Sequence, residues 1–427
     1  MHELSKSTSP TREVVITGLG VISPIGIGKT AFWNSLYAGR SGVRPVSAFD
    51  TSGTPVRLGA EVVEFDPKEY VKQRKSLKVM ARDIHFAVAA ADMAYQDSCL
   101  SASTVDPERF GVVFGADMIQ CQPDDVADAF RHCIVEGRFD FRRWGQGALP
   151  EVFPLWMLKY LPNMPACHIA IAYDARGPNN THSLSEVSSL LAVAEAARAI
   201  ERGQADVMLV GGTGSRIHPT TWVRNALAEV STRDDDPAAV SRPFDAHRDG
   251  FVNGEGAAVF VLESIQHAQA RGARVLARVI GQASAFEAPR AGRPVEGTAI
   301  RAVLSGALRS SGLKPGEIGH VNAHGLSTVA DDRAEARAIR AVLGDVPVTA
   351  PKSLFGNLGA GSGAVEMAAS LLAFEHDLVP STLNYEYPDP ECPVNVIHGK
   401  PLAGATATAL LVNRAPMGQS AALVIAR

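Results

Sequence analysis

Short runs of apolar and β-branched residues alternate along the chain with longer stretches rich in alanine. Short runs bounded by turn residues are typical of buried strands, and the longer stretches are typical of helices. This alternation predicts a layered α/β fold. We expect strands at residues 14–17, 111–115, 207–211, 257–262, 318–322, 410–413 and 421–425, and helices at residues 30–38, 79–97, 187–202, 298–311, 331–343 and 363–374.

Two of the expected helices differ from the others. Residues 187–200 read VSSLLAVAEAARAI and residues 363–374 read GAVEMAASLLAF, so each is small or apolar almost all round. Such helices are expected inside the protein. One in each half suggests a pseudo-duplicated architecture, with an N-terminal half at residues 12–265 and a C-terminal half at 266–427. Weak periodicity and several aromatics mark residues 120–161 as an insertion that packs over something, such as a partner subunit.

Composition narrows the range of functions. The chain has 427 residues, 46% of them hydrophobic, and a formal net charge of −4, which argues against a protein that binds duplex nucleic acid. The first dozen residues hold no apolar signal-peptide core, and no uninterrupted apolar run is long enough to cross a membrane. The five cysteines are scattered and form no CxxC pair, which favours reduced thiols in a cytoplasmic protein.

Three short patterns resemble ligand-binding motifs without completing them. Gly18, Gly20 and Ser23 nearly form GxGxxG, but the third glycine is missing and Pro24 follows. SPIGIGKT, at residues 23–30, lacks the first glycine of a phosphate-binding loop. His320 and His324 have no third residue nearby to complete a metal site, and we expect His320 to be a core histidine. No metal or cofactor is therefore predicted.

Longer ordered motifs carry a family resemblance from about residue 12 to the C-terminus. They are VVITGLGVISPIG (14–26), ARGPNNTHSLSE (175–186), ADVMLVGG (205–212), SRPFDAHRDGFVNGEGAAVFVLE (241–263), HVNAHGLSTVADDRAEARAI (320–339) and PKSLFGNLGAGSGAVE (351–366). The chain thus resembles the elongating β-ketoacyl-acyl-carrier-protein synthases. This resemblance implies a thiolase-type, five-layered αβαβα fold, a dimer, no cofactor, and acyl substrates carried by an acyl carrier protein.

The resemblance also assigns candidate catalytic residues. The family's nucleophilic cysteine lies eight residues after the Gly-Pro of the ARGP motif, and this position is Glu186 here. The family's first histidine matches His324, and the second matches Asn357. The lysine of the latter motif is kept as Lys352. Cys167 lies well before the ARGP motif and does not take the nucleophile position.

Two further regions are expected to contact substrate or carrier. Residues 414–418 stand where the family has a flexible GFGG loop, which makes Pro416, Met417 and Gly418 candidate substrate-binding residues. Proline fixes φ, so we expect this loop to be stiffer than its counterpart. A basic run precedes residue 79, and within it Arg74 and Lys75 are candidates for docking an acidic carrier protein. A solvated basic face explains the same run equally well.

The substitutions leave several functions open. A glutamate at the start of a buried helix cannot hold an acyl chain as a stable thioester, and it would repel an incoming malonyl carboxylate. One possibility is a non-condensing partner of an active ketosynthase, like the chain-length factors of polyketide systems. Others are a malonyl carrier protein decarboxylase, an enzyme using Glu186 and His324 as an acid–base pair, and a synthase with residual activity. In a purely structural alternative, Glu186 forms an ion pair with protonated His324. Homodimer and heterodimer both remain open.

Overall fold

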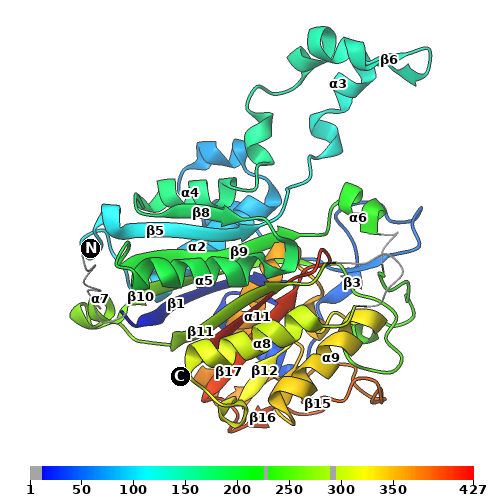
Figure 1. Cartoon of the computed structure of the whole chain (residues 1–427). Coiled ribbons are helices and arrows are strands. Elements are labelled where there is room, and N and C mark those ends of the chain that lie inside the picture. Colours follow the sequence, from blue (N-terminus) through cyan, green and yellow to red (C-terminus); the bar gives the residue numbers. More distant parts are fainter. Residues whose placement is uncertain (1–11, 226–228, 289–294) are drawn as a thin grey trace, which may run out of the picture.

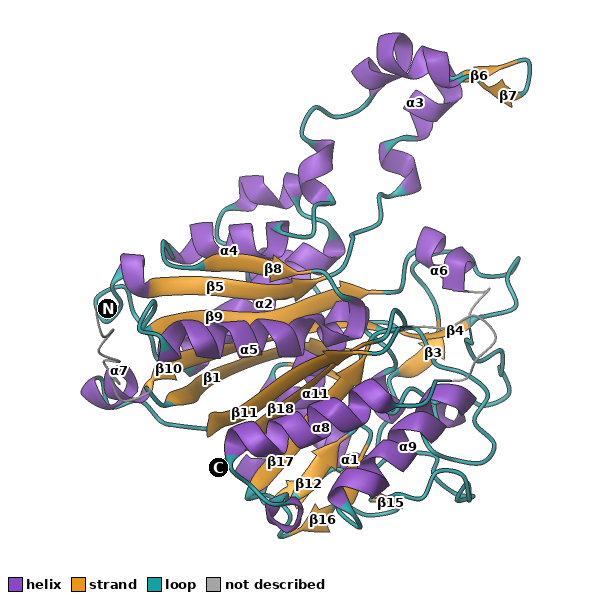
Figure 2. Cartoon of the chain, viewed as in Figure 1, coloured by secondary structure: helices purple, strands orange, loops and turns teal. Residues whose placement is uncertain are grey.

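A computed structural model describes residues 12–225, 229–288 and 295–427. The fold is built on a 12-stranded mixed sheet in the order β15-β13-β12-β17-β18-β11-β1-β10-β9-β5-β8, with β2 paired to β1 (Figures 1 and 2). The strands are β1 (Val14–Ser23), β2 (Gly26–Ile27), β5 (Phe110–Ala116), β8 (Asn179–His182), β9 (Val207–Ser215), β10 (Glu255–Ser264), β11 (Ala277–Phe286), β12 (His320–Asn322), β13 (Pro347–Thr349), β15 (Asn395–Val396), β17 (Thr408–Arg414) and β18 (Gln419–Ala426).

The sheet consists of two halves with the same connectivity. In the N-terminal half, β1 pairs antiparallel with β10 and β10 with β9, whereas β9–β5 and β5–β8 are parallel. In the C-terminal half, β11, β18, β17, β12 and β13 repeat this sequence of antiparallel and parallel pairs. A short pairing of β1 with β11 joins the halves. The predicted pseudo-duplication is confirmed, although the sequence did not indicate β11.

Helices cover and separate the two halves of the sheet. Helix α2 (Arg82–Asp97) packs on β1, β10 and β9 and contacts α4 (Met164–Tyr173), while α8 (Thr298–Ser311) packs on β11 and β18 and contacts α9 (Val329–Leu343). Between the halves lie α5 (Ser188–Glu201) and α11 (Ser362–His376), which contact each other and strands of both halves. The layers are therefore αβαβα, and the two apolar helices are central, as predicted.

The glycines at the start of the chain serve helix packing. A Cβ atom at Gly20 would lie 2.0 Å from the carbonyl oxygen of Ala90, and one at Gly18 would lie 2.4 Å from that of Ala94. Glycine therefore lets β1 approach α2 closely. Lys29, from the sequence resembling a phosphate-binding loop, forms an ion pair with Asp97 on α2.

Residues 120–161 form an arm that projects from the body of the molecule (Figure 1). Near its tip lie helix α3 (Ala127–His132) and the hairpin of β6 (Ile134–Val135) and β7 (Arg138–Phe139). The arm has only a small core, which Ala129, Cys133, Ala148 and Val152 form. Many of its large apolar side chains are exposed, so the arm is a candidate contact surface. Within the described part of the chain, no helix is long and apolar enough to cross a membrane.

Candidate active site

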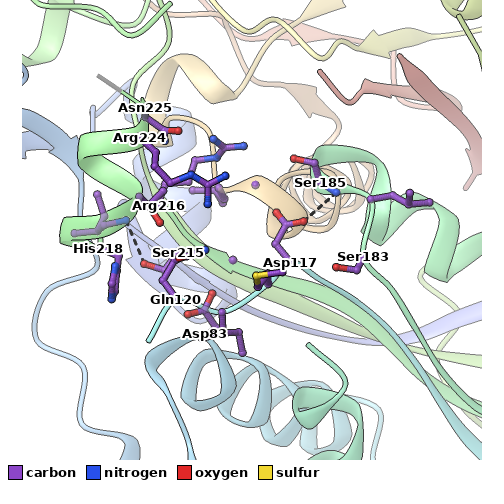
Figure 3. Close-up of a pocket in the computed structure, with 18 of the residues that line it drawn as sticks. Asp83, Asp117, Gln120, Ser183, Ser185, Ser215, Arg216, His218, Arg224 and Asn225 are labelled. Atoms are coloured by element: carbon purple, nitrogen blue, oxygen red, sulfur yellow. Dashed lines mark hydrogen bonds between the residues drawn. The ribbon is translucent and has the colours of Figure 1, made fainter. Parts of the chain in front are cut away.

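A chamber of about 490 Å³ opens where the carboxyl ends of β5 and β9 meet. Asp117 follows β5 and Arg216 follows β9, and both lie on its wall. Figure 3 shows Arg216 and Arg224 on one side of the chamber and Asp117 and Ser185 on another. Apolar side chains from both halves complete the wall: Met118, Ile119, Leu184, Ile217, Phe286, Leu358 and Met417.

Glu186 lies just behind this wall, in the short 3₁₀ helix Ser185–Val187 that leads into α5. The turn is tight, because Ser185 adopts a left-handed φ of 56°. The Ser188 hydroxyl holds the turn by accepting from the Leu184 N–H (2.8 Å) and donating to the Ser185 carbonyl (2.7 Å). Only 1% of Glu186 is exposed, so its charge depends on neighbouring protein groups.

Arg216 and Asn357 are the groups that bind this carboxylate. Glu186 Oε1 accepts from Arg216 Nη2 at 2.5 Å and from Asn357 Nδ2 at 2.9 Å. Burial opposes ionisation, but the Arg216 charge and the Asn357 amide outweigh it and lower the pKa of Glu186 below its usual value. Glu186 is therefore an ionised, ion-paired carboxylate.

The structural alternative in which Glu186 forms an ion pair with protonated His324 is wrong. His324 is buried, and its Nδ1 lies 3.2 Å from Lys352 Nζ and 3.3 Å from Asn413 Nδ2. Both neighbours are donors, so Nδ1 accepts and the ring proton belongs on Nε2. Burial, followed by the charges of Lys352, Arg414 and Arg216, holds the pKa of His324 well below its usual value. His324 is thus neutral, and Glu186 is paired with Arg216 instead.

A second buried ion pair supports His324. Lys352 Nζ contacts Glu366 on α11 and donates to the His324 carbonyl at 2.8 Å. Asn413 Nδ2 donates to the other Glu366 oxygen at 2.7 Å. The main chain is also fixed, because Glu335 accepts from the N–H groups of residues 324 and 325. Lys352 therefore fixes the orientation of the imidazole.

Asn357 connects the Glu186 carboxylate to the main chain at Gly359 and to Ser362. Its Oδ1 accepts from the Gly359 N–H (3.0 Å) and the Ser362 hydroxyl (3.2 Å), and its Nδ2 donates to Glu186. These contacts fix the orientation of the amide and commit one of its N–H groups to the carboxylate. Asn357 is thus a neutral donor facing a negative charge.

Known proteins with the same motifs and fold identify the family of this chain. The model of the β-ketoacyl synthase N-terminal domain matches residues 11–268, and that of the C-terminal domain matches residues 276–386. The chain belongs to the β-ketoacyl synthase family. A 3-oxoacyl-[acyl-carrier-protein] synthase 2 from Synechocystis is 36% identical over 395 residues, covering 91% of this chain and 92% of the relative. The fold is accordingly the thiolase-like fold of ketosynthases, and the family acts in fatty acid and polyketide biosynthesis.

Two solved ketosynthase structures resemble this chain along most of its length. A ketosynthase/chain length factor for ishigamide has a TM-score of 0.85 and 30% identity, covering 97% of this chain and 99% of that one. A type II polyketide synthase acyl-carrier protein in complex with its ketosynthase, bound to the hexaketide, gives a TM-score of 0.81 at 30% identity and the same coverage. Homologous ketosynthases therefore bind carrier proteins and pair with chain length factors.

The predicted substrate loop of this ketosynthase is the turn between β17 and β18. The Ala415 N–H donates to the Gln419 carbonyl and the Gly418 N–H donates to the Ala415 carbonyl, which closes the turn around Pro416. Met417 is 75% exposed and lies on the chamber wall, but Pro416 and Gly418 do not line the chamber. The turn is thus at the chamber mouth, and its role in substrate binding remains a prediction.

The candidate docking residues lie on the surface. Arg74 and Lys75 begin the 3₁₀ helix Arg74–Val79, which precedes α2, and both side chains are exposed. Neighbouring Lys72 instead faces the body, with its Nζ 3.5 Å from Asp92 and 5.2 Å from the centre of the Tyr173 ring. Carrier docking at Arg74 and Lys75 remains a prediction.

Sequence reasoning missed two charged residues of the site, Asp117 and Arg216. Asp117 accepts from the N–H groups of Ser185 (3.0 Å) and Ala360 (3.1 Å) and so connects the two halves beside Glu186. Burial and the Glu186 charge raise the pKa of Asp117, although Arg216 opposes this effect. In the structure each directly follows a buried strand, β5 or β9, and a charged residue at such a strand end is the signal that could have found them.

His320 is the core histidine that the sequence predicted. Its Nδ1 lies 2.7 Å from the Ala405 carbonyl and its Nε2 lies 3.3 Å from the Ser370 hydroxyl, so both nitrogens have partners. All five cysteines are free, and within the described residues none of them hydrogen-bonds to His324.

Proposed function

We propose that this ketosynthase is a non-condensing member of its family that pairs with an active ketosynthase in the manner of a chain-length factor. In this proposal Glu186 takes the place of the nucleophilic cysteine and Asn357 takes that of the second histidine. The supporting observation is the buried Glu186–Arg216 ion pair at the head of α5. A thiolate normally carries the acyl chain, and a carboxylate would form only a labile anhydride.

The surroundings of Glu186 also argue against the other enzymatic functions. A general base needs a free carboxylate lone pair near its substrate. Glu186 Oε1 is bound by Arg216 and Asn357, and Oε2 has no hydrogen-bond partner among the described residues. The side chain is, however, almost fully buried and does not line the chamber, so this free lone pair does not face a substrate there. Malonyl decarboxylation would bring a second carboxylate close to Glu186. Oxyanion stabilisation by Asn357 would depend on the second N–H of its amide alone, because the first is bound to the Glu186 carboxylate.

The arm supports the partner role. Its exposed apolar side chains include Phe141 (73%), Phe153 (48%) and Leu155 (51%). Apolar side chains concentrated on a projecting arm are expected to be covered by a partner. The ishigamide structure is a ketosynthase/chain length factor, which makes a second ketosynthase chain the occupant that we infer.

Acyl transfer provides the test of this function. Purified protein incubated with malonyl and acyl carrier proteins should gain no acyl mass and release no acetyl carrier protein, as followed by intact-mass spectrometry. A cysteine-dependent ketosynthase under the same conditions is the positive control. Formation of acetyl carrier protein would support the decarboxylase alternative, and an acyl adduct would support residual synthase activity. Either result would contradict the non-condensing proposal.

Carrier docking is tested separately. We infer that Arg74 and Lys75 attract an acidic carrier protein, because both are exposed cations in a chain of net negative charge. Reversing both charges (Arg74→Glu with Lys75→Glu) should weaken carrier binding by about tenfold at low salt and by less at high salt. Reversal of two exposed cations in the C-terminal half, Arg309→Glu with Lys400→Glu, is the matched control. Equal binding by both double variants would contradict the assignment.

A further inference from the structure

The chamber and the predicted catalytic residues occupy separate compartments. Among the described residues that line the chamber, none of Glu186, His324, Lys352 and Asn357 is present. Arg216 belongs to both sides: it is part of the chamber wall, and its guanidinium contacts Glu186. A ligand that enters the chamber would therefore meet Arg216 before it could reach Glu186.

Several contacts hold Arg216 in this position. Only 16% of its side chain is exposed, its Nη2 is bound to Glu186, and its guanidinium carbon lies 5.7 Å from the centre of the Phe251 ring. The Asp117 carboxylate also lies close to Arg216, and both side chains border Gly359. A Cβ atom added at Gly359 would lie 2.9 Å from Asp117 Oδ2 and 3.5 Å from Arg216 Nε. Two carboxylates thus flank one guanidinium. Swinging it away would leave Glu186 as a buried, unpaired charge.

We propose that Arg216 closes the passage from the chamber to residue 186, so that this chain is blocked by occlusion as well as by the loss of a nucleophile. The proposal rests on the non-condensing function. It makes a separate claim, that restoring a thiol alone does not restore acylation. Arg216 thereby determines which chemical groups can reach residue 186 from the chamber.

Acylation of an introduced thiol measures this access. In Glu186→Cys, the new thiolate would attack the carbonyl of an octanoyl carrier protein. A new carbon–sulfur bond would form as the bond to pantetheine breaks, and the pantetheine thiol would leave with the proton lost by the cysteine. The adduct is followed by mass spectrometry of the peptide containing residue 186, which separates it from the five natural cysteines.

We expect Glu186→Cys to be acylated slowly, because Asp117 and the Phe251 ring still hold Arg216 in place when Glu186 is absent. Glu186→Cys with Arg216→Ala should be acylated about tenfold faster or more, because the rate scales with the fraction of open molecules. The second variant removes both charges of a buried pair, which proteins tolerate better than the loss of one. Arg309→Ala in the Glu186→Cys background is the matched control. Arg309 is an exposed arginine on α8 that does not line the chamber, and the acylation rate of this variant should equal that of Glu186→Cys alone.

The outcomes separate this proposal from the proposed function. Rapid acylation of Glu186→Cys alone, at the rate of the double variant, would overturn the occlusion but not the non-condensing role. The occlusion is likewise overturned if Arg309→Ala accelerates acylation as much as Arg216→Ala does. Acylation of the unaltered chain would overturn the proposed function instead. Thermal unfolding of each variant checks that it is folded, and Arg216→Ser, which keeps a hydrogen-bonding group, replaces Arg216→Ala if that variant does not fold.

Discussion

Replacing Lys352 by methionine should lower the free energy of unfolding by about 3–5 kcal/mol near pH 8. The side chain is 2% exposed, and its ammonium group contacts Glu366 and two atoms of His324. Without it, the Glu366 carboxylate, which is 1% exposed, keeps only the Asn413 amide as a hydrogen-bond donor among the described residues. Denaturant unfolding monitored by circular dichroism measures the loss.

The pH dependence of this loss has a definite sign. Burial raises the pKa of Glu366 even in the unaltered chain, where Lys352 opposes that effect. In Lys352→Met the pKa should rise further, so Glu366 can take up a proton and avoid an unpaired charge. A group whose folded-state pKa is raised stabilises the fold at low pH, and this stabilisation is lost as pH rises through that pKa. The variant should therefore be closer to the unaltered chain at pH 5.5 than at pH 8.

Two variants control for the loss of a lysine in general. Lys352→Met with Glu366→Gln removes both charges and should recover most of the stability. Lys72→Met removes a surface lysine whose side chain is 69% exposed, so it should cost less than about 1 kcal/mol. A cost below about 1 kcal/mol for Lys352→Met at pH 8 would show that the buried pair is not important for stability.

The central helices and most strands could be predicted because the hydrophobic pattern that indicates each one lies within its own short stretch of sequence. An all-round apolar stretch can only be stable when buried, and α5 and α11 meet this condition. Strand β11, with the sequence ARVIGQASAF, was missed because its residues are small and mixed in polarity. It forms a strand because β1 and β18 provide hydrogen-bond partners on both edges, which is a non-local cause.

The sequence motifs predicted four residues of the candidate site, but neither their pairings nor the two further charged residues, Asp117 and Arg216. Motif positions gave Glu186, His324, Lys352 and Asn357, and these residues all lie in the buried groups described above. They did not give Arg216, because the expected strand ended at residue 211 whereas β9 continues through the glycine-rich stretch to Ser215. Because β5 and β9 are parallel neighbours, their carboxyl ends meet, and charged residues directly after both strands indicate a shared site. Asp117 and Arg216 occupy these two positions.

The exposed apolar side chains of the arm, residues 120–161, should have a large effect on association with a partner chain. The arm itself projects away from the body of the molecule (Figure 2). Its most exposed side chains do little for the core of the chain, because they belong to none of the large buried clusters of that body. If a partner chain covers them, they are the aromatic and aliphatic anchors on which interface energy concentrates. Their removal should therefore affect association strongly and folding of the body only weakly.

Changing Phe141, Phe153 and Leu155 together to serine should weaken dimer formation by at least about 100-fold, for a homodimer or for a heterodimer with an active ketosynthase. Sedimentation velocity across a dilution series measures the change. Tyr37→Ser with Tyr387→Ser is the matched control, because both tyrosines are more than half exposed (57% and 54%) but lie outside the arm. The control should associate as the unaltered chain does. A triple variant with unchanged association would show that the partner contacts another surface, since exposed apolar area that binds nothing has no energetic effect when it is removed.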